Sequence, residues 1–208
     1  TPPASESLRE LLGRPAVQAL LMMQYLRTCF WGCASMSIPY LLNNLAVHAK
    51  STVGFYSLGS LSSAMVSMLV LGGLSDANKN GGTIARCCLL GLAVLSPCIG
   101  VAGRAGSTVG VLVAGWCATC LAWSVSGQIN PLTRSVARRG SEGRLTGLVS
   151  AAWAAGSLCG AQLHGWGVNS RLRLLYFGLG ALLVVAERCT TVLLRAVAAD
   201  NTAVDNCA

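Results

Sequence analysis

Long apolar runs alternate with short polar segments along almost the whole of this 208-residue chain. Each run has few charges and about 20 residues, the length with which an α-helix crosses roughly 30 Å of hydrocarbon. The runs lie near residues 16–40, 53–74, 84–102, 107–130, 145–165 and 174–195. The strict alternation that marks a membrane β-strand is missing from them. The pattern therefore predicts an all-α, multi-pass membrane protein, a bundle of six transmembrane helices.

Two polar tails flank the predicted bundle of residues 15–195. They cover residues 1–14 and 196–208 and show no apolar periodicity, so both are expected to be mobile. The chain begins with Thr1 rather than Met. Removal of a presequence would point to a mitochondrial or plastid membrane, whereas simple trimming of the chain keeps the plasma membrane as an alternative.

Composition supports a membrane protein. Only 11% of the residues are charged, 53% are hydrophobic and the mean hydropathy is +0.60. A soluble domain has about 25% charged residues, so a water-soluble protein is excluded. The 24 glycines fit the same class because small residues let transmembrane helices approach closely.

Basic residues divide unevenly between the two sets of predicted loops. The side of the termini holds nine: Arg9, Arg14, Lys79, Arg86, Arg134, Arg138, Arg139, Arg144 and Arg195. The opposite side holds four: Lys50, Arg104, Arg171 and Arg173. Basic residues of short loops stay on the cytoplasmic or equivalent side, so both termini are predicted to be inside. The net charge of +8 is thus mainly a topology signal, and no nucleic-acid partner is expected.

The ten cysteines do not indicate a disulfide scaffold, because nearly all fall inside predicted helices, where they act as small hydrophobes. Cys117 and Cys120 have CxxC spacing, which leaves a metal or redox site as the alternative to helix packing. No second pair accompanies them, and His48 and His164 lie elsewhere in the sequence. No metal, no cofactor and no enzyme activity are therefore predicted, since a phosphate loop and a nucleophile with its base are also missing from the sequence.

Polar residues inside apolar runs are the candidates for function, because an ionisable group there costs at least about 2.5 kcal/mol. Gln24, Arg27 and Trp31 fall on one face of the first helix. Three interpretations of Arg27 stay open: recognition of a solute anion or ring carbonyl, a structural ion pair, and snorkelling to the membrane surface. An Arg27 to Glu187 pair across the bundle would neutralise both charges.

Aromatic residues extend the candidate solute site. Tyr56 and Trp123, together with Trp31, could stack on a flat ligand, and Gln128 adds a polar group near the inner end of the fourth run. The predicted solute-binding set is therefore Gln24, Arg27, Trp31, Tyr56, Trp123 and Gln128. The alternative is that these aromatic side chains anchor helix ends at the membrane interface.

Two segments carry a resemblance to a known superfamily. The first is the loop signature Gly72, Asp76 and Lys79, which resembles a degraded form of the signature between the second and third helices of major facilitator transporters. It departs from that signature at Ala77, where an Arg is expected, so the usual gating ion pair is in doubt. The second runs from Arg138 to Ser150 and then to Gly156 and Gly160, which resembles the basic loop and small-residue fifth helix of a facilitator half. Glycines four residues apart offer a flat stripe for another helix.

Within that superfamily the chain resembles the C-terminal half of the eukaryotic riboflavin transporters. The similar segments are 38–40, 56–68, 131–135 and 154–161, about a third of the chain. Facilitators move solute between two six-helix halves, so the resemblance implies that this chain supplies one half and needs a second copy or another membrane subunit. It implies transport of a small organic solute, riboflavin-like in the nearest case. The alternative is an accessory or structural subunit of a larger, organellar membrane complex.

Overall fold

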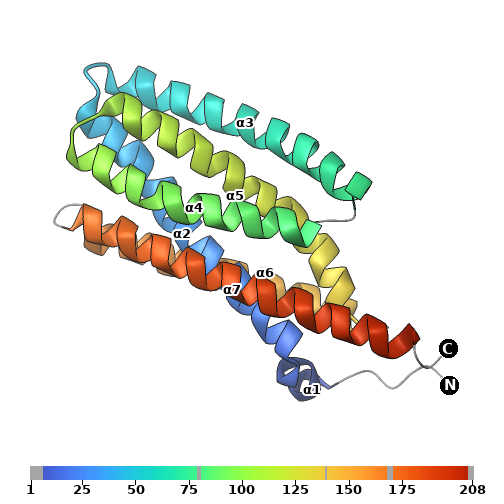
Figure 1. Ribbon diagram of the computed structural model, residues 1–208. Helices are drawn as coiled ribbons and strands as arrows, with labels where there is room; N and C mark the ends of the chain where they lie inside the picture. The colour runs from blue at the N-terminus through green and yellow to red at the C-terminus, as the bar shows by residue number, and fades with distance from the viewer. Residues whose placement is uncertain (1–6, 79–80, 139, 168–170, 206–208) are drawn as a thin grey trace.

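The computed structural model describes residues 7–78, 81–138, 140–167 and 171–205, with side chains for all of these except 76–78 and 200–205. These residues form one short and six long helices (Figure 1). The helices are α1 (Leu8–Gly13), α2 (Pro15–Leu45), α3 (Ala49–Asn78), α4 (Gly81–Arg104), α5 (Thr108–Val136), α6 (Glu142–Gly167) and α7 (Leu172–Asp205). Each long helix covers one predicted apolar run and extends beyond at least one of its ends; the run near 107–130 begins one residue before α5. A local cap fixes the start of α5: the hydroxyl of Ser107 accepts a hydrogen bond from the backbone N–H of Gly110 in the first turn.

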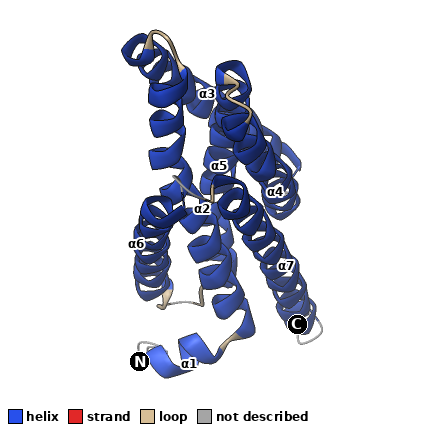
Figure 2. Cartoon of the chain, turned by 90° about the vertical axis from the view of Figure 1, so that its left-hand side faces the viewer, coloured by secondary structure: helices blue, strands red, loops and turns tan. Residues whose placement is uncertain are grey.

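Both predicted tails carry helix, although neither shows apolar periodicity in the sequence. In α1, the Ser7 hydroxyl and the Glu10 carboxylate form a reciprocal capping box, and Leu11 is fully buried. The backbone N–H of Ser7, and then its hydroxyl, lower the pKa of Glu10 by donating to its carboxylate. At the other end, α7 continues from the sixth apolar run through residue 205. Figure 2 shows α1 turning away from the axis of α2, beneath the bundle.

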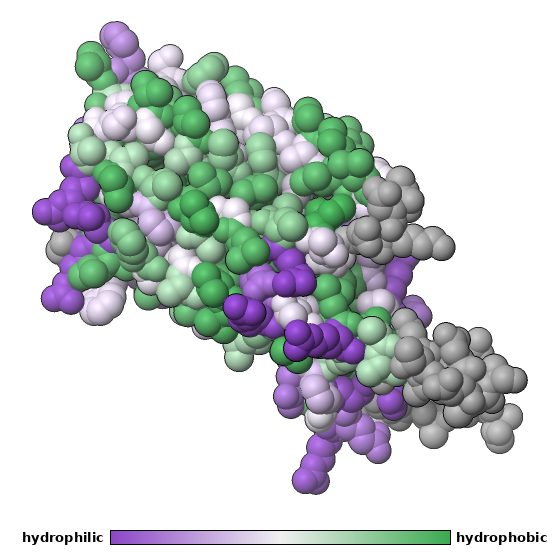
Figure 3. All heavy atoms as spheres, in the orientation of Figure 1, coloured by the Kyte–Doolittle hydropathy of each residue, from purple (hydrophilic) through white to green (hydrophobic). Residues whose placement is uncertain are grey.

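Within the described residues, four helices are long and apolar enough to cross a membrane. The spans are Ala49–Ser75, Gly81–Arg104, Thr108–Val136 and Leu172–Ala199. α2 and α6 have comparable lengths, 31 and 26 residues, but they are not among these spans. In Figure 3, hydrophilic residues gather at the left edge and in the lower centre, and apolar residues cover most of the face above them. The protein is thus an integral membrane protein built of helices.

The contacts made by the first three long helices, α2 to α4, are repeated by the last three, α5 to α7. α2 packs on α6 as α5 packs on α3, and α2 packs on α7 as α5 packs on α4. The equivalent helices α2 and α5 also touch each other, as do α4 and α7. Trp31 and Pro39 of α2 have the same spacing as Trp123 and Pro131 of α5, and the two indole rings meet edge to face with centroids 6.0 Å apart. The pattern of helix contacts therefore stays approximately the same when the triplets α2–α4 and α5–α7 are exchanged.

The tightest helix crossing joins α2 to α6. A Cβ added at Gly156 would collide with the Tyr25 carbonyl, and one at Gly160 with the backbone of Cys29 and Cys33. Gly32 on α2 faces the Ser157 backbone in the same way. The four-residue spacing predicted a flat stripe of this kind, and the backbones meet where side chains would have held them apart. This crossing fixes the distance between the polar faces of α2 and α6.

Candidate functional site

Three helices bring weakly polar residues to one place. On each helix the residues recur at intervals of three or four, so they share a face. They are Gln24 and Arg27 on α2, Trp123, Ser126, Asn130 and Thr133 on α5, and Thr146, Ser150 and Trp153 on α6. Together these faces line a partly open cavity of about 370 Å³. The set is unusual for helices of a membrane protein because lipid-facing positions are apolar.

Arg27 is the charged residue of this cavity and is only 3% exposed. Its Nη1 donates to the Ser126 hydroxyl at 2.6 Å and to the Ala122 carbonyl at 3.0 Å. Its Nε and Nη2 both donate to the Gln24 side-chain oxygen, at 3.3 and 3.1 Å. Every one of these acceptors is neutral. The guanidinium is thus held in one orientation by dipoles of α2 and α5, with its charge uncompensated by them.

Tryptophans form the apolar wall of the site. A smaller space of about 50 Å³ adjoins the main cavity and is bounded by Arg27, Trp31, Trp123 and Trp153. A third space of about 300 Å³ continues along the groove between α2 and α6 and again touches Trp31 and Trp153. The guanidinium therefore lies beside three indole rings that come from three different helices. Such a surface can stack on a flat ring while the arginine binds a polar group on it.

Four of the six predicted solute-site residues meet here, and two do not. Gln24, Arg27, Trp31 and Trp123 line these spaces. Tyr56 instead lies between α3 and α5, where its carbonyl accepts from the Trp116 indole N–H at 3.0 Å. Gln128 accepts from the Ser75 hydroxyl at 2.7 Å and joins α3 to α5.

Tyr56 is separate because it lies on α3, which does not line these spaces, and Gln128 is separate because residues of α5 occupy more than one face. Gln128 is two residues from Ser126, and that spacing turns its side chain toward α3. Sequence reasoning did not include Ser126, Thr146 and Ser150 in the solute-binding set. The signal that could have found them is the recurrence of small hydroxyl residues at helical spacing with Trp123 and Trp153.

The predicted Arg27 to Glu187 pair is wrong. Glu187 on α7 accepts from Arg86 Nε at 2.7 Å, with its side chain only 4% exposed, and Arg188 Nε lies 3.7 Å away. The Thr191 hydroxyl donates to the same carboxylate at 3.0 Å. The physical reason is that this face of α7 packs on α4, whereas Arg27 faces α5. Arg86 thus forms an ion pair within the bundle. It is also one of the nine basic residues counted on the side of the termini.

The predicted loop signature is only partly within the described residues. Gly72 lies inside α3, with open space around the position of a Cβ. Asp76 is in the last turn of α3 rather than in a loop, and its side chain is not described. Lys79 lies outside the described residues. Of the signature, only Gly72 has a described environment, and it does not line the site.

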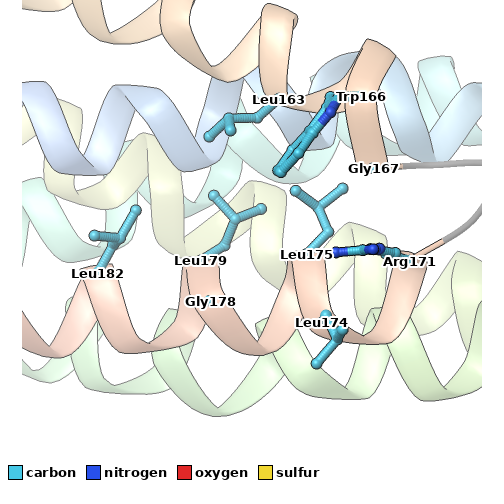
Figure 4. A pocket seen from close by; sticks show the side chains of 9 residues that line it. All are labelled: Leu163, Trp166, Gly167, Arg171, Leu174, Leu175, Gly178, Leu179 and Leu182. Carbon is cyan, nitrogen blue, oxygen red and sulfur yellow. The ribbon is translucent and has the colours of Figure 1, made fainter.

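A second cavity of about 370 Å³ lies between α6 and α7 and differs in chemistry (Figure 4). Leu163 and Trp166 point from α6 toward Leu175 and Leu179 of α7. Arg171 is the one charged residue of its lining. A lining of this kind suits acyl chains, whereas the cavity beside Arg27 offers a cation, two amides and several hydroxyls. The latter is the candidate solute site.

Comparison with protein-family models and with curated proteins gives no match to this chain. The assignment of function consequently rests on the geometry of the site and on the arrangement of the helices.

Proposed function

We propose that this chain is one six-helix half of a facilitator-type transporter, and that it moves a small organic solute together with a second half. The second half would be another copy of the chain or a partner subunit. The observation that carries the proposal is the exchange of helix contacts between α2–α4 and α5–α7. Nested three-plus-three repeats of this kind build each half of a facilitator.

The composition of α2 and α6 supports the same proposal. Both are long enough to span about 30 Å of hydrocarbon, yet they are less apolar than the four clear spans. Their less apolar residues include the glycines of the α2–α6 crossing and the polar residues of the cavity. A helix that faces protein and solute on two sides needs fewer apolar residues than one that faces lipid. We therefore assign α2 and α6 as the remaining two spans, with both ends of the bundle inside.

Reconstitution of a tandem fusion tests the transport proposal. Two copies joined through a flexible linker would place two halves in one chain, because α1 and the end of α7 lie at the same end of the bundle (Figure 1). Liposomes that contain the fusion should take up labelled riboflavin or another solute of a small panel faster than protein-free liposomes. A fusion and a single chain that both fail to move any solute, with the single chain a stable monomer, would contradict transport.

A second function is favoured by one observation on α3. Its apolar side chains are exposed, with Leu58, Leu61, Met65 and Leu69 each more than 60% exposed. A partner subunit could cover this face, in which case the chain would be an accessory subunit of a membrane complex rather than a transporter half. Purification in mild detergent from the native membrane distinguishes the two, because a chain that always migrates alone or as a homodimer contradicts the accessory role.

A further inference from the structure

We infer that the cavity beside Arg27 takes a flat organic anion, with the acid group on the guanidinium and the ring against the tryptophans. The inference rests on the proposed function, since it treats the cavity as the solute site, and it narrows the solute from any small organic molecule to an anion. An anion also differs from the neutral, riboflavin-like solute that the sequence resemblance implies.

The first argument is that the charge of Arg27 has no acidic partner among the described side chains. Glu10 caps α1, Glu142 is exposed at the start of α6, and Glu187 pairs with Arg86. An arginine stays protonated in proteins, so burial does not remove its charge. A buried cation without a counter-ion is costly, and an anion that enters the cavity would offset that cost.

The second argument is geometric. Hydrogen bonds to Gln24, Ala122 and Ser126 engage four of the five N–H groups of Arg27 and fix the guanidinium plane. One N–H at Nη2 is left for a ligand. The Ser126 hydroxyl, which accepts from Nη1 and donates to the Ala122 carbonyl at 3.2 Å, can reorient toward an acid oxygen. Because the protein already holds the guanidinium in place, little side-chain entropy is lost when an acid group binds.

The third argument concerns the shape of the solute. The indole rings of Trp31 and Trp123 meet edge to face at 73°, and Trp153 borders the same space. Flat rings stack on or abut such surfaces favourably. The main cavity of about 370 Å³ is at the lower end of the range for small-molecule sites, which suits a molecule of one or two rings.

Binding of matched probes to the purified full-length chain tests the inference. The probes are 2-naphthoate, its neutral amide 2-naphthamide, and hexanoate as an anion without a ring. Quenching of tryptophan fluorescence reports binding. The wild-type chain should bind 2-naphthoate about tenfold or more tightly than either comparison probe, because a charge-assisted hydrogen bond is stronger than a neutral one.

Substitutions show which residues cause the preference for 2-naphthoate. Arg27→Gln should bind 2-naphthoate and 2-naphthamide equally, and Arg27→Lys should keep part of the preference because it keeps the charge. Trp153→Leu should reduce the advantage of 2-naphthoate over hexanoate. Arg104→Gln, an exposed arginine at the end of α4, is the matched control and should bind as the wild-type chain does. Thermal unfolding shows whether each variant is folded.

Two outcomes would overturn the inference. One is equal affinity of the wild-type chain for the acid and the amide, and the other is a preference for the acid that survives in folded Arg27→Gln. Failure of the proposed function is separable from both. Anion binding that depends on Arg27, without uptake by the tandem fusion, supports the inference and contradicts transport. Uptake of a neutral flavin that Arg27→Gln leaves unchanged supports transport and contradicts the inference.

Discussion

Arg27 on α2 and Arg86 on α4 are both arginines of long helices, but among the described side chains only Arg86 has an acidic partner. Arg86 donates to Glu187 at 2.7 Å and keeps 38% of its side chain exposed. Arg27 is 3% exposed and donates only to neutral acceptors. The first arrangement neutralises charge where two helices cross, which is a structural role. The second leaves one positive charge at the wall of a cavity, and this is how a binding site differs from a packing contact.

The contrast depends first on the α2–α6 crossing, which holds Trp153 opposite Arg27. Gly160→Ala should destabilise the protein by about 3 kcal/mol, because the new Cβ meets the α2 backbone and forces the helices apart. Gly147→Ala on the same helix is the control, since a Cβ there has open space and improves helix propensity. Thermal unfolding in detergent measures both. Equal stability of the two variants would show that the crossing does not hold the site together.

Neutralising each charge should give opposite results at the two arginines. Arg86→Gln leaves the buried Glu187 carboxylate unpaired and should cost about 2 kcal/mol, a value reduced by the partial exposure of Arg86. Adding Glu187→Gln should recover part of this loss. Arg27→Gln should leave the melting temperature unchanged or raise it, because the uncompensated charge is removed. A loss of stability in Arg27→Gln as large as that in Arg86→Gln would erase the contrast.

A neutral buried pair provides a reference for both arginines. The Ser37 and Tyr176 hydroxyls lie 2.5 Å apart between α2 and α7, each fully buried. Tyr176→Phe should cost about 1 kcal/mol in unfolding free energy, the net value of a typical hydrogen bond. Because Tyr176 lies away from the cavity, binding of 2-naphthoate should not change. Weaker binding in this variant would mean that packing of α7 also shapes the site.

The smallest effect is expected at α1, which lies outside the four apolar spans. The Ser7 N–H and hydroxyl lower the pKa of Glu10, so the capping box is fully formed above the pKa of the unfolded chain and is lost as the pH falls through the lowered value. Nuclear magnetic resonance shifts of α1 should therefore change on acidification in the wild-type chain and stay nearly constant in Glu10→Gln. Titration of Glu10 should not affect the cavity beside Arg27. A change in 2-naphthoate affinity over the same pH range would contradict this expectation.

Sequence reasoning was accurate where a property belongs to one helix. The face shared by Gln24, Arg27 and Trp31, and the stripe of Gly156 and Gly160, follow from the helical repeat alone, and the structure has both. It was wrong about a contact between two helices. Glu187 was expected opposite Arg27, but the choice of partner depends on which helices are neighbours, and periodicity carries no information about that.

The sequence by itself determined that this is a helical membrane protein, where its long helices lie, and which faces of those helices are small or polar. Helix length, apolarity and periodicity are local, so each run of residues defines its own helix. The tertiary structure decided that Arg86 neutralises Glu187, that Tyr56 and Gln128 pack against other helices, and that three tryptophans from three helices surround Arg27. These contacts join residues up to 126 positions apart, because helix crossings rather than sequence spacing set which side chains meet.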